Sequence, residues 1–139
     1  DPLSVIPSGL SLVTGVLDKM FGFWSLPDDK RTLFISRLYR ALVELLLRFE
    51  NDWSSGNIDK SKVLIVHFDR MMNDFDKLMD DIIKFTDQKS TDILLNEISI
   101  TSKKQKTFKS KHKYNLERFG LSENKIKEDC KKYYETFIN

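Results

Sequence analysis

The sequence predicts a mainly α-helical chain with one buried parallel strand, at about residues 63–67, that belongs to a larger α/β fold. Apolar residues recur every three or four positions over residues 6–20 and over 34–49, and this spacing predicts two long helices. The run "VLIVHF" is continuous and rich in β-branched residues, which is typical of a strand buried on both faces of a parallel sheet. A lone strand is not stable by itself, so we expect its neighbouring strands upstream of Asp1.

The first helix begins with the chain. Asp1 and Pro2 have the residue types of an N-cap and a first helical position, where a carboxylate caps the backbone and a missing N–H costs least. Pro7 lacks the N–H that a helix interior needs, so we expect a distorted first turn and a regular helix from about Pro7. The loop "GFWSLPDD" (22–29) follows, and the large apolar side chains in and beside it, Phe21, Phe23, Trp24 and Leu26, are candidates for lining an apolar pocket or for plain core.

The second helix begins at an aspartate of this loop, Asp28 or Asp29, and runs to about Asn51. The segment 54–62 has the composition of a loop that leads into the strand. Beyond the strand, apolar residues at helical spacing predict three more helices: about 72–86, about 90–99, and a last one that Ser122 caps.

The composition excludes several classes of protein. Hydrophobic residues make up 40% of the chain and charged residues 32%, which excludes a chain disordered by composition and a membrane protein. The longest apolar run, "ALVELLL", contains Glu44 and is too short to span a bilayer. Cys130 is the only cysteine, so the chain can form neither an internal disulfide nor a Cys-based metal site, and we expect no metal. The single cysteine favours a reducing compartment such as the cytoplasm, and a Golgi location stays open.

Positive charge is concentrated in one segment. The net charge is +2, but "SKKQKTFKSKHKY" (102–114) carries six lysines and no acid, so the rest of the chain is net acidic. A basic segment on an acidic body favours an anionic partner, and a solvated lysine loop is the alternative.

Three stretches, in chain order, are similar to elements of one enzyme family. These are "DPLSVIPS" at the start, "KVLIVHFDRMMNDFDKLMDDIIKFT" from residue 62, and "KHKYNLERFGLSENKIKEDCKKYYETF" from residue 111. Together they resemble the PAPS-dependent sulfotransferases, most closely their broad bacterial-type branch. The resemblance implies a P-loop-like α/β fold when complete, of which residues 1–139 are the C-terminal portion of a single domain. The family's 5′-phosphosulfate loop is then expected upstream of Asp1, as are the catalytic residues.

The resemblance also implies nucleotide-binding residues. Ser8 matches the serine that grips the 3′-phosphate of PAPS, and a hydroxyl in the first turns of a helix adds a donor to free backbone N–H groups. Phe68 stands where the family often has a tyrosine beside the adenine, so that stacking survives without the hydroxyl. Related sulfotransferases have a basic lid near the C-terminus that closes over the nucleotide, and Lys109, Lys111 and His112 are assigned to it because they lie at the start of the third stretch, although the "RKG" triplet of the cytosolic branch is absent. The alternatives are that Ser8 is only a helix-start residue and that Phe68 is core at a strand end.

The function implied by the resemblance is transfer of a sulfuryl group from PAPS to a hydroxyl or amine acceptor. This chain would supply the 3′-phosphate and adenine side of the site, and we expect it to be inactive alone. The alternative is a catalytically inactive helical interaction module whose basic segment binds anions or nucleic acid. The lack of arginine in residues 102–114 argues against nucleic acid, so we expect PAPS or PAP and an unidentified acceptor as partners.

Overall fold

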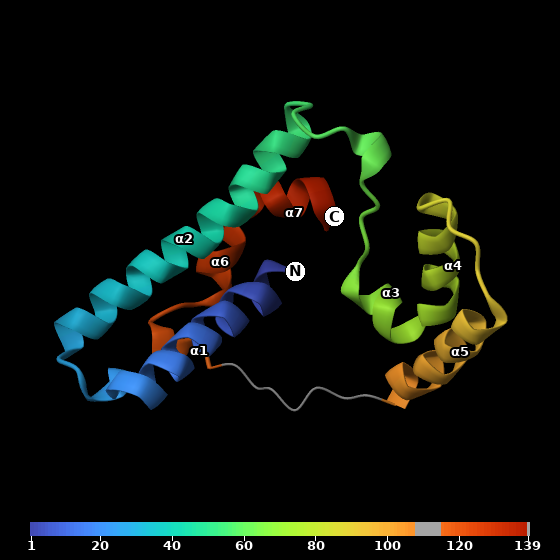
Figure 1. Ribbon diagram of the computed structural model, residues 1–139. Coiled ribbons are helices and arrows are strands. Elements are labelled where there is room, and N and C mark those ends of the chain that lie inside the picture. The colour runs from blue at the N-terminus through green and yellow to red at the C-terminus, as the bar shows by residue number, and fades with distance from the viewer. Residues whose placement is uncertain (108–114, 139) are drawn as a thin grey trace. The chain divides into compact units, whose positions relative to one another are not determined.

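The computed structural model describes residues 1–107 and 115–138, which divide into two compact units (Figure 1). The first unit comprises Asp1–Ile58 with His112–Asn139, and the second comprises Asp59–Lys111. The first unit contains α1 (Pro2–Phe21), η1 (Phe23–Ser25), α2 (Asp28–Ser54), η3 (Glu117–Phe119), α6 (Glu123–Asp129) and α7 (Lys131–Phe137). The second unit contains η2 (Lys60–Lys62), α3 (Phe68–Asn73), α4 (Phe75–Phe85) and α5 (Asp92–Thr107).

The helix α1 begins at Pro2 and passes through Pro7 without a break, so the expected start at about Pro7 is wrong. The Asp1 side chain caps the helix, and Pro7 is buried on the same side as Ile6. Burial of Pro7 against the core offsets the hydrogen bond that a proline cannot make, and this position lies early in the helix.

The helix α2 is longer than expected at its C-terminal end, and its N-cap is Pro27. Asp28 and Asp29 therefore lie in the first turn, where their carboxylates favour the positive end of the helix dipole. The last predicted helix is divided at Cys130 into α6 and α7, because the backbone of Cys130 (φ −104°, ψ 17°) leaves the helical region.

The expected buried parallel strand at residues 63–67 is wrong, and with it the α/β part of the predicted fold. The structure shows no strand anywhere in residues 1–107 or 115–138, although the prediction of a mainly helical chain agrees with it. Val63 (φ −127°, ψ 121°) and His67 (φ −77°, ψ 137°) are extended, as β-branched sequences favour. Their neighbours Leu64, Ile65 and Val66 are more than a third exposed. An extended segment becomes a strand only when a second one pairs with it, and no described segment does so.

The core of the first unit lies between α1, α2 and the C-terminal helices. Ile6 and Leu10, one turn apart on α1, are fully buried, as are Ile126 of α6 and Cys130. The Thr14 hydroxyl, one turn further along, donates to the Leu10 carbonyl at 2.7 Å and so satisfies itself within the helix. Segments from both ends of the chain thus form one core.

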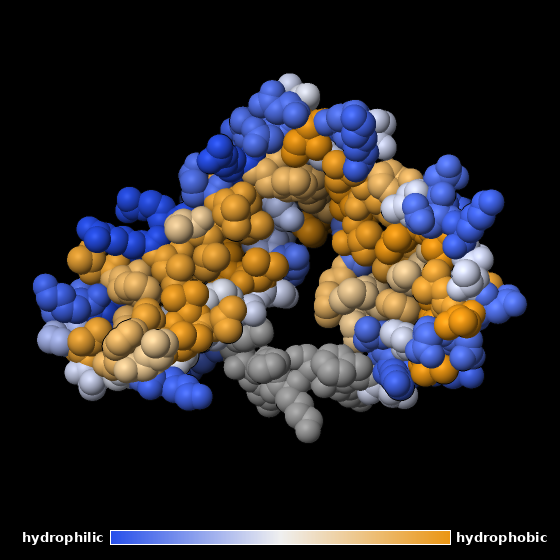
Figure 2. Space-filling view, viewed as in Figure 1, coloured by the Kyte–Doolittle hydropathy of each residue, from blue (hydrophilic) through white to orange (hydrophobic). Residues whose placement is uncertain are grey.

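Other apolar side chains of the first unit face outward. Figure 2 shows them gathered over α1 and α2 on the face turned to the viewer. Those on α1 lie on one side of the helix, and about half or more of the surface of each is exposed. They are Val5, Leu12, Val16 and Met20.

The second unit is smaller and packs α5 against α3 and α4. Its most buried apolar residues are Leu78 of α4 and Ile98 of α5. The Arg70 guanidinium of α3 lies 2.8 Å from the Asp81 carboxylate of α4 and ties these two helices together.

Candidate functional site

The N-terminal end of α1 is where the first and the third of the three quoted stretches meet. The Asp1 carboxylate accepts a hydrogen bond from the Leu3 backbone N–H at 2.9 Å and one from the Tyr134 hydroxyl at 2.8 Å. Tyr134 belongs to α7, so the third stretch contacts the first. Burial raises the pKa of Tyr134, which keeps the hydroxyl protonated and able to donate.

The free N–H groups expected at this helix start are already occupied. Leu3 donates to the Asp1 side chain, and the N–H groups of Ser4 and Val5 donate to the Asp1 carbonyl at 3.0 Å each. A phosphate at this end of α1 would therefore have to be held by side chains. Ser8 lies in the second turn of α1 and is half-buried.

Phe68 is the first residue of α3, in the second unit, and its side chain is 64% exposed. The alternative that Phe68 is a core residue at a strand end is therefore wrong. An exposed phenyl face is available for stacking on a planar ligand. Ser8 belongs to the first unit and Phe68 to the second.

The predicted lid residues Lys109, Lys111 and His112 lie outside the described residues. The first part of the lysine-rich segment, however, is helical, because α5 continues to Thr107 instead of ending at about residue 99. Lysine has a good helix propensity, and the basic side chains of the last turn favour the negative end of the helix dipole.

A polar cluster joins α2 to α6 in the first unit. The Tyr39 hydroxyl donates to the Asp129 carboxylate at 2.6 Å, and the Lys125 ammonium lies 3.0 Å from the same carboxylate oxygen, Oδ2. The hydrogen bond from Tyr39 and then the Lys125 ammonium lower the pKa of Asp129, although partial burial opposes them. Burial and the Asp129 carboxylate raise the pKa of Tyr39, so this hydroxyl is a donor at any ordinary pH.

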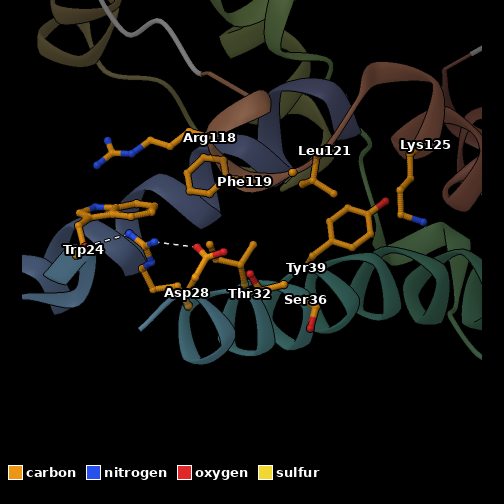
Figure 3. Close-up of a pocket in the computed structure, with 12 residues that line it drawn as sticks. Trp24, Asp28, Thr32, Ser36, Tyr39, Arg118, Phe119, Leu121 and Lys125 are labelled. Carbon is orange, nitrogen blue, oxygen red and sulfur yellow. Dashed lines mark hydrogen bonds and ion pairs between the residues drawn. The ribbon is translucent and has the colours of Figure 1, made fainter. Parts of the chain in front are cut away.

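Beside this cluster is a pocket of about 580 Å³ (Figure 3). Its walls come from η1, the first half of α2, η3 with the turn that follows it, and α6. They carry aromatic, apolar, hydroxyl and charged side chains: Trp24, Asp28, Arg31, Thr32, Ile35, Ser36, Tyr39, Arg118, Phe119, Gly120, Leu121 and Lys125.

Sequence reasoning found part of this pocket. Of the four candidates, Trp24 lines the pocket, and Phe23 is core, with its ring 5.3 Å from that of Phe34. Phe21 and Leu26 are exposed and do not line it. The cationic residues Arg31 and Arg118 were missed. Arg118 lies within the C-terminal stretch, directly before Phe119-Gly120, and this position was the available signal.

Within residues 1–107 and 115–138, no group of three or more histidine, cysteine or acidic side chains is arranged to hold a metal ion. No described helix is long and apolar enough to cross a bilayer. Comparisons of the chain with protein-family models, with curated proteins and with solved structures found no match.

Proposed function

We propose that this chain binds PAP and PAPS as the 3′-phosphate and adenine side of a PAPS-dependent sulfotransferase, which transfers a sulfuryl group to a hydroxyl or amine acceptor. The order of three sulfotransferase-like stretches in the sequence supports this proposal. The observation that supports it best is the 2.8 Å hydrogen bond from Tyr134 to Asp1, because it joins the last stretch to the first at the end of α1 that carries Ser8.

The 3′-phosphate is assigned to side chains. Because Asp1 occupies the first N–H groups of α1, the Ser8 hydroxyl supplies one short donor, and Lys109, Lys111 and His112 supply positive charge. The adenine is assigned to the exposed ring of Phe68, where stacking of a base on an aromatic ring stabilises binding by about 1–3 kcal/mol.

The 3′-phosphate is also the basis of the test. Calorimetry on the 139-residue chain compares PAP with AMP, which has the same base, sugar and 5′-phosphate but no 3′-phosphate. We expect PAP to bind at least about tenfold more tightly than AMP, since a hydrogen bond to a charged group contributes about 1.5–3 kcal/mol. Equal affinity for the two nucleotides, or no binding of PAP, would show that the proposal is wrong.

The second candidate is a helical interaction module without nucleotide chemistry. The exposed apolar side of α1 favours it, since contiguous exposed apolar surface on a protein often marks a contact with another molecule. A chain that is folded but binds neither PAP nor AMP would favour this candidate over the sulfotransferase.

A further inference from the structure

We propose that the pocket between α2 and the η3 turn is a second binding site, for a small oxyanion carried on an aromatic ring. The oxyanion is a sulfate, sulfonate, phosphate or carboxylate. This site lies wholly in the first unit, and neither Ser8 nor Phe68 lines it, so the inference does not rest on the proposed nucleotide function.

The floor of the pocket suits an aromatic ring. Ile35 of α2 and Phe119 of η3 are buried beneath it, and Leu121 contributes a further apolar side chain. The backbone of Gly120 is left-handed (φ 66°, ψ 30°), which turns the chain between Phe119 and Leu121 so that both line the pocket. A volume of about 580 Å³ lies within the usual range for small-molecule sites.

Cations outnumber acids around the pocket. Arg31, Arg118 and Lys125 line it, against the single carboxylate of Asp28. Asp28 is already paired with Arg31 at 2.7 Å, and Lys125 is paired with Asp129 at 3.0 Å. Arg118 pairs with no carboxylate among the residues that the structure describes, so it is the cation that an anionic ligand would neutralise.

Arg118 is also held in position. Its guanidinium carbon lies 3.8 Å from the centre of the Trp24 ring, a cation–π contact that fixes the plane of the guanidinium and leaves its N–H edge for a ligand. Arg31 lies at the same end of the pocket, since it donates to the Trp24 carbonyl at 2.9 Å. In Figure 3, Arg118 and Lys125 lie on opposite sides, with Phe119, Leu121 and Tyr39 between them. We therefore assign the oxyanion to the Trp24 end and the ring to the apolar floor.

The probes are naphthalene-2-sulfonate, 2-naphthyl phosphate and 2-naphthoate, with neutral 2-naphthol as the matched control. Calorimetry on the 139-residue chain is expected to show that at least one anion binds about tenfold more tightly than 2-naphthol, since one charge-assisted hydrogen bond has that effect. The order of the three anions identifies the oxyanion class. Equal affinity for all four probes would overturn the proposal.

Substitutions test whether the anionic probes bind at Arg118. Arg118→Gln keeps a planar amide over Trp24 but removes the charge, and we expect it to lower the affinity for the preferred anion about tenfold and to leave 2-naphthol unchanged. Arg118→Lys should keep part of the affinity, and Arg37→Gln, which removes an exposed charge elsewhere on α2, should keep all of it. If Arg37→Gln lowers the affinity for the preferred anion as much as Arg118→Gln does, the proposal is wrong.

A filled pocket gives an independent test. Thr32→Trp places a large side chain at an exposed position of the lining without changing any charge, so we expect it to abolish binding of every naphthyl probe. Parent-like binding by Thr32→Trp would contradict the site. Ser8→Ala should leave naphthyl binding unchanged, and an equal loss of PAP and probe binding in that variant would mean that there is one site and not two.

Discussion

The Tyr134 hydroxyl donates a 2.8 Å hydrogen bond to the Asp1 carboxylate, which lies 133 positions away in the chain. The same oxygen of Asp1 accepts the N–H of Leu3, so one carboxylate both caps α1 and holds α7. The helix that carries Ser8 is therefore joined at its N-cap to the C-terminal helix α7.

Removing this hydrogen bond should weaken the first unit. We expect Tyr134→Phe to lower the free energy of unfolding by about 1 kcal/mol, since the bond reaches a charged acceptor in an exposed setting. Tyr133→Phe is the matched control, because the structure gives the Tyr133 hydroxyl no hydrogen bond to a described residue. Both tryptophans lie in the first unit, so urea unfolding followed by tryptophan fluorescence reports on it. Equal losses in the two variants would contradict the role of Tyr134.

The Tyr39–Asp129 contact predicts a dependence of stability on pH. The hydrogen bond from Tyr39 lowers the pKa of Asp129 below its usual value of 3.8 in the folded chain. As the pH falls, the Asp129 carboxylate is therefore protonated in the unfolded chain before it is protonated in the folded chain. The stability from Asp129 is present above about pH 5 and is lost as the pH falls through the lowered pKa.

The variant Tyr39→Phe removes the donor, so the pKa of Asp129 should move back toward its usual value. We expect the loss of stability between pH 6 and pH 3 to be smaller in Tyr39→Phe than in the parent, and the variant to be about 1–2 kcal/mol less stable at pH 6. Urea unfolding at the two values of pH measures both effects. A pH dependence identical to that of the parent would rule out this account of Asp129.

The core assignment of α1 is tested by two leucines on opposite sides of the helix. Leu10 is fully buried and Leu12 is 69% exposed. We expect Leu10→Ala to cost about 2–5 kcal/mol of unfolding free energy through the cavity that it leaves. Leu12→Ala should change the unfolding free energy by less than about 0.5 kcal/mol. A large loss in Leu12→Ala would indicate that this side of α1 is covered in solution.

Substitution by alanine should change the free energy of unfolding in opposite directions at two glycines. Gly15 lies inside α1 with no atom near an added Cβ, so Gly15→Ala should stabilise the first unit by about 0.5–1 kcal/mol. Gly120 has a φ of 66°, so Gly120→Ala should destabilise it by about 1 kcal/mol. Thermal unfolding of the two variants checks the signs, and stabilisation by Gly120→Ala would contradict the left-handed turn at the pocket.

Local patterns in the sequence were enough to predict most of the helices. The apolar spacing of residues 6–20 and 34–49 predicted α1 and α2, since burial of one face stabilises a helix of that length. The run at 63–67 specified extended backbone, but whether an extended segment pairs with another is decided elsewhere in the chain. The break at Cys130 had no signal in the apolar spacing, which continues across it.

The candidate site could be predicted only in part for the same reason. Ser8 was correctly predicted to lie in the first turns of a helix. Whether the N–H groups at the start of that helix are free depends on the local backbone, and here Asp1 accepts their hydrogen bonds. The stacking of Arg118 on Trp24 joins residues from distant parts of the sequence. No local pattern encodes such a contact, and it needed the folded arrangement of α1, α2 and the C-terminal helices.

We propose that Ser8 holds the 3′-phosphate of the nucleotide, and this assignment can be tested by measuring PAP binding by Ser8→Ala at low and at high salt. The variant loses one hydrogen bond to a charged group, so we predict a loss of affinity of about tenfold to a hundredfold that persists at high salt. Lys109→Ala and Lys111→Ala should lose less, and salt should reduce their effect because it screens the attraction between a lysine charge and a phosphate. Ser11→Ala, on the next turn of α1, is the matched control. If Ser8→Ala binds PAP like the parent at both salt concentrations, Ser8 is only a helix-start residue and the 3′-phosphate assignment is wrong.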